Sequence, residues 1–302
     1  MTTASQGASA GVAQGLVVVG VDGSEETLGA LRYAAVEAGA AGVGLKLVHV
    51  VPDHLPISPM VPLTPGELTE TGTEILRAAE AFVHEVAPGL AVESWLHHGT
   101  RSGQLVEGST GARVLVVGRD THPLAERLLR GDAATGVAAR SLVPVVQVPA
   151  DWLPPAPDRE PTVVAGVKEP AHSAALLGDA FAVAHQLGAT LVVLHSWTMP
   201  SGYDDIIESR VASQDWSRKS VLAIEDVLRE WRAAFPDVKV EVRVVHDHAA
   251  HALVEAAKDA DLVVLLRRAH GVPAATHLGG TARAVLRSAT IPVRVVAPTG
   301  KK

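Results

Sequence analysis

One structural unit occurs twice in this sequence, and the repeat constrains the fold more than any other feature. Residues 114–148 contain an apolar run, a glycine-bearing loop, a helical stretch and a closing apolar run after Pro144. Residues 262–296 contain the same series, with Pro292 before the closing run. Short apolar runs bounded by loops are typical of strands buried on both faces of a sheet. A strand, a glycine loop and a helix in this order form a unit that can hold a phosphate group.

The spacing of matched residues indicates a duplicated chain. Gly131 and Gly279 lie 148 positions apart, whereas Asp22 and Lys168 lie 146 positions apart. One net length change of two residues between these points explains both values. Constant spacing across half of a chain indicates duplication, and the 302 residues suffice for two domains.

Strands alternate with helices in both halves, which predicts parallel sheets with helices on both faces. In the first half we expect strands over 16–22, 45–51, 91–97, 114–118 and 145–148 and helices over 25–38, 66–86, 102–109 and 133–141. In the second half we expect strands over 162–167, 190–197, 238–245, 262–266 and 292–296 and a long helical region over 204–234. Ser24 is expected to cap the first helix, and Gly39 is expected to end it.

Composition divides the chain into regions and narrows its class. We expect a disordered tail over 1–14, a first domain over 15–149, a proline-rich linker over 150–161 and a second domain over 162–298. The net charge of −7 argues against nucleic acid as the main partner, and the absence of cysteine is typical of a cytoplasmic protein. No apolar run approaches the roughly 20 residues of a membrane span, so no membrane partner is expected.

Several stretches resemble the universal stress protein family, in a form with two such domains in one chain. In the first half the resemblance rests on residues 17–24 (VVVGVDGS), 47–50 (LVHV), the loop 118–132 and residues 144–146 (PVV). In the second half it rests on residues 194–195 (LH), 260–264 (ADLVV) and 279–286 (GGTARAVL). The resemblance covers nearly the whole chain apart from the tail and the linker.

The resemblance implies two tandem doubly wound α/β domains, each with a five-stranded parallel sheet in the strand order 3-2-1-4-5. This arrangement is of the flavodoxin-like or adenine nucleotide alpha hydrolase-like type. The resemblance also implies that the two domains, or two chains, pair through their last strands. An internal pair of domains already satisfies this pairing, so a monomer and a homodimer of tandem chains both fit it. The identity of any other protein partner stays open.

Many members of the family bind ATP, and the resemblance implies which residues of the first half would take part. Asp22 matches an aspartate that meets the adenine. Gly118 and Gly131 match glycines of the loop that holds the ribose and the phosphates. The positions expected to line the base pocket are Gly20, Val21 and Val50.

The same loop departs from the ATP-binding pattern at two positions. Thr121 replaces its second glycine, and its Cβ crowds a backbone that has to approach phosphate closely. Asp132 replaces a serine or threonine, just before Ala133. A carboxylate about 4 Å from a phosphate charge costs on the order of 4 kcal/mol at an effective dielectric near 20, unless a metal ion lies between them. We expect no such metal.

The second half departs further from the pattern. Lys168 replaces the adenine-side aspartate, and Leu266 and Ala269 replace both loop glycines. A Gly-Gly-Thr sequence at the start of a helix still offers N–H groups and a hydroxyl to an anion. We therefore expect an anion site that differs from the usual adenine site. Its candidate residues are Lys168, Arg267, Arg268, Gly279, Gly280 and Thr281.

Simpler structural roles explain several of these residues without a ligand. Ordering of the first helical turn explains Asp22, and a turn before a helix explains Gly131 and Gly279. Solvated surface charge explains Arg267 and Arg268. The sequence leaves both kinds of role open.

Neither the histidines nor the hydroxyl groups form a recognisable catalytic or metal motif. His248 and His251 have the spacing that places two side chains on one helix face. Structural zinc sites usually have four ligands, however, and the sequence has no cysteine. His49 and His195 are expected to be hydrogen-bonded core residues. No Walker A loop, dinucleotide fingerprint or nucleophile elbow is present, so enzymatic activity is not expected.

These observations favour a stress-response module regulated by a ligand. It would have a degenerate ATP site in its first half and a more degenerate anion site in its second. A structural or partner-binding protein that holds no nucleotide is one alternative, and a slow ATP hydrolase is another. Thr121 and Asp132 are the residues that separate the ligand-regulated module from the protein that holds no nucleotide. Steady phosphate release from ATP would identify the slow hydrolase.

Overall fold

The computed structural model describes residues 15–52, 64–119, 133–198, 212–267 and 278–298, apart from the side chains of residues 133 and 212–215. The first half contains strands β1 (Val17–Gly20), β2 (Leu45–Val51), β3 (Val92–His98), β4 (Val114–Gly118) and β5 (Val145–Val148), and helices α1 (Glu26–Ala41), α2 (Pro65–Val86), α3 (Arg101–Gly108) and α5 (Ala133–Arg140). The second half contains strands β6 (Thr162–Gly166), β7 (Thr190–Trp197), β8 (Val240–His246), β9 (Leu262–Leu266) and β10 (Val293–Val296), the 3-10 helix η1 (Pro170–His172), and helices α6 (Ala174–Leu187), α8 (Ala212–Ala234), α9 (Ala249–Ala257) and α10 (Gly280–Ser288).

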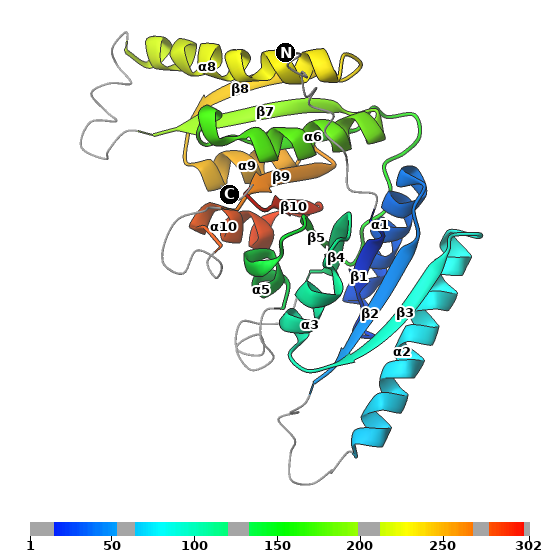
Figure 1. Cartoon of the computed structure of the whole chain (residues 1–302). Helices are drawn as coiled ribbons and strands as arrows, with labels where there is room; N and C mark the ends of the chain where they lie inside the picture. The colour runs from blue at the N-terminus through cyan, green and yellow to red at the C-terminus, as the bar shows by residue number, and fades with distance from the viewer. Residues whose placement is uncertain (1–14, 53–63, 120–132, 199–211, 268–277, 299–302) are drawn as a thin grey trace, which may run out of the picture.

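The ten strands form one continuous mixed sheet in the order β3-β2-β1-β4-β5-β10-β9-β6-β7-β8 (Figure 1). Within each half the strands are parallel and follow the order 3-2-1-4-5. The halves meet where β5 and β10 run antiparallel, with Val146 opposite Arg294. The predicted α/β class, the strand order and the pairing through the last strands are therefore confirmed.

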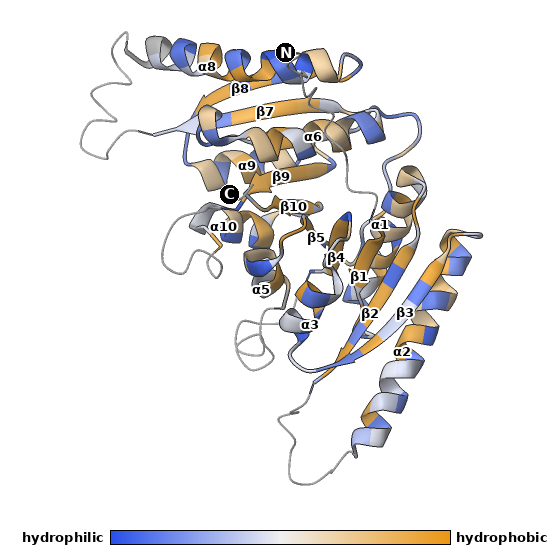
Figure 2. Ribbon diagram, in the orientation of Figure 1, coloured by the Kyte–Doolittle hydropathy of each residue, from blue (hydrophilic) through white to orange (hydrophobic). Residues whose placement is uncertain are grey.

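Helices cover both faces of the sheet, and the apolar core is distributed differently on the two faces. Under α3, α5, α9 and α10 one hydrophobic cluster runs through both halves, from Val18 to Val295. Under α1 and α2, and under α6 and α8, the clusters are separate. Figure 2 shows that the central strands are mainly hydrophobic and that the helices beside the sheet carry both hydrophobic and hydrophilic residues. The shared cluster joins the apolar cores of the two halves on that side of the sheet.

Two predicted details of the first helix are wrong. Helix α1 continues through Gly39 and ends at Gly42, which has a left-handed φ of 65°. Gly39 is tolerated inside the helix, whereas Gly42 supplies the conformation that needs glycine. Ser24 does not cap the helix: the N-cap is Glu25, without a side-chain hydrogen bond. By contrast, α2 has a capping box in which Thr64 and Glu67 bond each other's backbone N–H groups.

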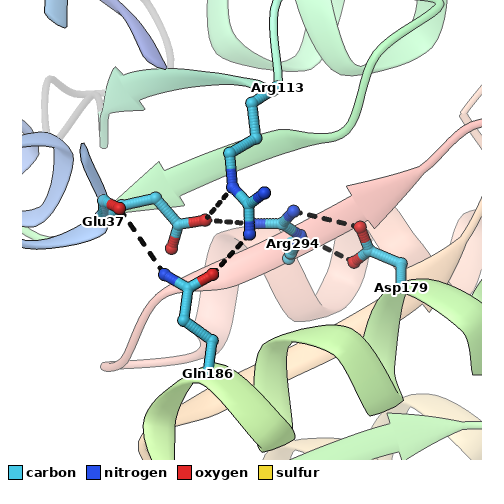
Figure 3. Close-up of polar contacts among 5 residues, drawn as sticks. All are labelled: Glu37, Arg113, Asp179, Gln186 and Arg294. Atoms are coloured by element: carbon cyan, nitrogen blue, oxygen red, sulfur yellow. Dashed lines mark hydrogen bonds and ion pairs between the residues drawn. The ribbon is translucent and has the colours of Figure 1, made fainter. Parts of the chain in front are cut away.

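Buried charged residues join the two halves on the face that lacks a shared apolar cluster (Figure 3). Arg294 of β10 donates two hydrogen bonds to Asp179 of α6, from Nε at 2.6 Å and from Nη2 at 3.0 Å. Its Nη1 lies 3.5 Å from Glu37 Oε1 of α1, and Arg113 Nε lies 3.5 Å from the same oxygen. Arg113 also donates to the side-chain oxygen of Gln186 in α6. We call these five residues the interface charge cluster.

The charges of the interface charge cluster balance. Burial alone would lower the pKa of Arg294, but the carboxylates of Asp179 and Glu37 raise it above its ordinary value. Arg294 and Glu37 are only 3 % and 4 % exposed. Buried ions persist only when they are paired, so this face of the interface depends on complementary charges contributed by both halves.

The segment between the halves packs against both of them. The ring of Trp152 contacts Tyr33 of α1 edge to face, with centroids 5.1 Å apart. Arg159 forms an ion pair with Asp261, and Lys239 donates to Glu160 at 2.8 Å. None of the helices in the described ranges is long and apolar enough to cross a membrane.

Candidate functional site

The candidate site of the first half lies where the strand order reverses. β1 pairs with β2 on one side and with β4 on the other, and Val19 lies beside Val116. The carboxyl ends of β1 and β4 therefore meet at one edge of the sheet. Asp22, just beyond β1, and Gly118, the last residue of β4, lie at this edge. In open α/β sheets the ligand crevice forms at such a point.

The carboxylate of Asp22 orders the start of α1. Its Oδ1 accepts hydrogen bonds from Ser24 N at 3.1 Å, Ser24 Oγ at 2.6 Å and Thr27 Oγ1 at 2.8 Å. These contacts confirm that Asp22 orders the first turn of α1, which is one of the two roles that the sequence left open. Partial desolvation raises the pKa of Asp22, but the hydrogen bonds from Ser24 and Thr27 outweigh it and lower the pKa below its ordinary value. The residue is nevertheless exposed, and Oδ2 accepts no hydrogen bond from the described residues.

The two strand-end histidines occupy equivalent places in the two halves. His49 Nδ1 lies 2.8 Å from Val21 O, and His195 Nδ1 lies 2.9 Å from Val167 O. Burial lowers the pKa of His49, so its ring is neutral at pH 7 and donates to the carbonyl. The prediction of a hydrogen-bonded core histidine is confirmed for His49, whereas His195 is hydrogen-bonded but only half-buried.

The residues predicted to line a base pocket are packed against the core. Val21 and Val50 are each 5 % exposed and belong to clusters on opposite faces of the sheet. A Cβ at Gly20 would lie 2.9 Å from a methyl carbon of Leu105. Their role in binding a base stays a prediction.

Packing is sufficient to require glycine at Gly118. A Cβ there would lie 2.6 Å from the carbonyl oxygen of Glu26, in the first turn of α1. Leu266 occupies the equivalent position of the second half, where the η1 turn replaces the first turn of α1. Packing against α1 therefore explains the glycine at position 118 independently of the predicted ligand role. Thr121, Gly131 and Asp132 lie outside the described residues, and so does the side chain of Ala133.

The candidate anion site of the second half is only partly described. Lys168 is exposed, and its Nζ lies 3.2 Å from Glu169 Oε1. Gly279 is the N-cap of α10, Gly280 is exposed and Thr281 is half-buried. Arg268 lies outside the described residues. The role of these residues in binding an anion stays a prediction.

Arg267 and its repeat counterpart Arg119 cross the interface between the halves. Arg267 is 7 % exposed, so the interpretation of this residue as solvated charge is wrong. Its Nη1 donates to Ser141 O at 2.8 Å and to Ala138 O at 3.3 Å, at the end of α5. Arg119 was not among the predicted residues. The signal was present, because Arg119 and Arg267 are 148 positions apart, the same offset as Gly131 and Gly279.

The histidine group of the second half takes part in local contacts. His248 is the N-cap of α9, so it does not share a helix face with His251. His251 Nδ1 lies 2.6 Å from Asp247 Oδ2, and His246 stacks on Trp197 with ring centroids 4.2 Å apart. Among the residues that the structure describes, no group of three or more potential metal ligands is arranged around one point.

Comparison with known proteins identifies the same family in both halves. The model of the Universal stress protein family matches residues 16–149 and 161–297. A universal stress protein of Mycolicibacterium smegmatis is 31 % identical over 288 residues, covering 93 % of this chain and 97 % of its own. Universal stress protein Rv2623 of Mycobacterium tuberculosis is 30 % identical over 300 residues, covering 92 % and 95 %.

A solved structure has the same fold over nearly the whole chain. The crystal structure of a universal stress protein from Archaeoglobus fulgidus is similar with a TM-score of 0.72 and 18 % identity. The likeness covers 95 % of this chain and 98 % of the other. At this identity the comparison supports the fold, including the arrangement of two halves in one sheet.

Proposed function

The chain belongs to the universal stress protein family, and from that premise we propose that it is a ligand-responsive stress module of the cytoplasm. In this proposal the first half holds a degenerate ATP site and the second half a more altered anion site. Any ATP hydrolysis is slow and secondary to binding.

The observation that carries the proposal is the state of Asp22. Its lowered pKa keeps the carboxylate ionised at neutral pH. All three hydrogen bonds from Ser24 and Thr27 go to Oδ1, so Oδ2, at an exposed position, has no hydrogen-bond donor among the described residues. An amino group such as that of adenine can donate to this oxygen. The position beside β4, where the strand order reverses, supports a ligand crevice there.

The sequence of the adjacent loop supports weak binding. Thr121 adds a Cβ where backbone has to approach phosphate, and Asp132 adds a negative charge. In the second half, Lys168 replaces the acceptor carboxylate with a cation. The start of α10 at Gly280 and Thr281 offers N–H groups that favour an anion rather than a base.

Mass spectrometry of denatured, freshly purified protein, combined with calorimetric titration of ATP, tests the ATP site. We expect ATP to titrate weakly, and we expect binding to be lost in Asp22→Ala. The absence of co-purified adenine nucleotide together with no calorimetric binding at high ATP would refute the binding proposal. That result would favour a structural or partner-binding protein. Steady phosphate release from ATP that disappears in Asp22→Ala would favour the slow hydrolase.

A double replacement tests the interpretation of the loop. Thr121→Gly with Asp132→Ser restores the residues that resemble ATP-binding members, so it is expected to strengthen ATP binding. Removal of one unfavourable charge pair is worth up to about 4 kcal/mol at close range, and solvent screening reduces this gain. The measurement is the dissociation constant by calorimetry, with Thr121→Ser as a control that keeps the Cβ. Unchanged affinity in the double variant would contradict this reading of the loop.

A further inference from the structure

Arg119 and Arg267 make equivalent contacts across the interface, each from its own half to a helix end of the other half. Arg119 directly follows Gly118 of β4, and its guanidinium donates to the carbonyl oxygens of Arg287 and Ala289 at the end of α10. Arg267 directly follows β9, and its guanidinium donates to the carbonyl oxygens at the end of α5. Each half thus extends an arginine from the end of its fourth strand to the last helix of the other half.

These carbonyl acceptors are the groups that a helix leaves unpaired. The last carbonyls of a helix have no partner inside the helix and carry its negative end, which a cation stabilises. Arg267 is buried, and burial lowers the pKa of its guanidinium. A buried cation needs compensating acceptors. The carbonyl of Ala138 in α5 and that of Ser141 directly after it supply them, so the contact is part of the packing rather than a transient surface pairing.

The opposite ends of the same two helices adjoin the candidate sites. Helix α5 begins at Ala133, directly after the loop of the first half, and α10 begins at Gly280 in the candidate anion site. The helices have 8 and 9 residues, which at about 1.5 Å per residue makes them roughly 12–14 Å long. A helix this short moves as one body. The arginine at its carboxyl end therefore also determines where its amino end lies.

We propose that Arg119 and Arg267 are positioning residues that link the two candidate sites across the interface. Arg267 positions α5 for the site of the first half, and Arg119 positions α10 for the site of the second half. Because Arg119 adjoins Gly118, a ligand that shifts this strand end also acts on α10. The ligand part of this inference rests on the proposed ATP site, whereas the link between arginine and helix does not.

Hydrogen exchange without ligand tests the link, using the full chain. In Arg267→Gln the amides of residues 137–141 in and after α5 are expected to exchange about five- to thirtyfold faster, the range spanned by a cation at a partly buried helix end. In Arg119→Gln the acceleration is expected in residues 285–289 of α10 instead. Each variant is the control for the other. Equal acceleration of both helices in both variants indicates general destabilisation and would overturn the proposal, as would no acceleration in either.

Titration of ATP tests the ligand part. Arg267→Gln is expected to weaken ATP binding by about five- to thirtyfold, with partial recovery in Arg267→Lys, whose ammonium can still reach one carbonyl. The control is Arg113→Gln, which removes a contact between the halves on the opposite face of the sheet and should leave the affinity unchanged. If the wild type binds ATP and Arg267→Gln binds it equally well, the ligand part is wrong. If the wild type binds no ATP, the proposed function and the ligand part of this inference are both wrong. The hydrogen-exchange experiment would still show whether each arginine positions the helix of the other half.

Discussion

Replacement of Arg294 by methionine should destabilise the whole chain, because this residue joins three elements from both halves. Arg294 lies on β10 and is 3 % exposed. It forms two hydrogen bonds with Asp179 of α6 and an ion pair with Glu37 of α1. Methionine fits a buried strand position and keeps much of the volume. The loss therefore comes from the charges that remain after the guanidinium is removed.

The structure gives the size of the effect. Arg294→Met removes two charge-assisted hydrogen bonds, worth about 1.5–3 kcal/mol each. Among the residues that the structure describes, it leaves Asp179 without a cationic partner and leaves Arg113 as the one such partner of Glu37. Breaking a buried pair from one side typically costs about 3–5 kcal/mol, which is a large part of the roughly 5–15 kcal/mol that stabilises a protein. The midpoint of thermal unfolding should fall by on the order of 10 °C.

Urea denaturation of a double-mutant cycle measures this prediction. Arg294→Met, Asp179→Asn and their combination should show a coupling of about 2 kcal/mol, because the combined variant no longer leaves Asp179 as an unpaired charge. Lys239→Met is the matched control: it breaks the exposed pair with Glu160, where side chains are 70 % and 48 % exposed, and should barely change the midpoint. A loss below about 1 kcal/mol for Arg294→Met, or strict additivity in the cycle, would refute the argument.

Two further predictions concern the first half. Gly118→Ala should lower the free energy of unfolding by about 1–3 kcal/mol, because its Cβ would meet the carbonyl oxygen of Glu26. Gly39→Ala, where the Cβ meets nothing within 4 Å, should raise it by about 0.5–1 kcal/mol; a loss in both variants would argue against the packing role. Because the pKa of Asp22 is lowered in the folded state, its ionised carboxylate adds stability that is present above the ordinary aspartate pKa and lost as the pH falls through the folded value. The stability difference between wild type and Asp22→Asn should therefore be constant near neutral pH and shrink below about pH 4, and denaturation curves in which it grows on acidification would contradict this.

The strands could be predicted from the sequence because each is an apolar run with clear limits. The bounds of β2, β4, β5, β7 and β9 were predicted to the residue, and a glycine, proline or charged residue flanks each of these runs on both sides except β7. Helix ends were less certain. Both Gly39 and Gly42 suit a helix end by residue type, and only the turn back to β2 selects Gly42 for the left-handed conformation.

The partners of charged side chains could not be predicted. The sequence shows that residue 267 is a cationic arginine. It does not show that the hydrogen-bond acceptors of this arginine are the backbone carbonyls of Ser141 and Ala138, which lie 126 and 129 positions earlier in the chain. Backbone carbonyls have no sequence signature. In the same way, the sequence suggested a cap role for Ser24 and a turn-ordering role for Asp22 independently. Only the geometry shows that Ser24 donates to Asp22 and that the N-cap of α1 is Glu25 instead of Ser24.

The duplicated halves differ in the buried charges where they meet, and this favours pairing within one chain. By the repeat offsets, the first-half counterparts of Arg294 and Asp179 are Val146 and Tyr33. The second-half counterpart of Glu37 is Val183. Two first halves paired in the same way would place Val146 opposite Val146 and would lack both Arg294 and Asp179. Two second halves would place Arg294 beside another Arg294, because in the antiparallel register Arg294 lies opposite its own counterpart, Val146. Like charges in a buried setting are strongly unfavourable, so only one half of each kind completes the interface charge cluster.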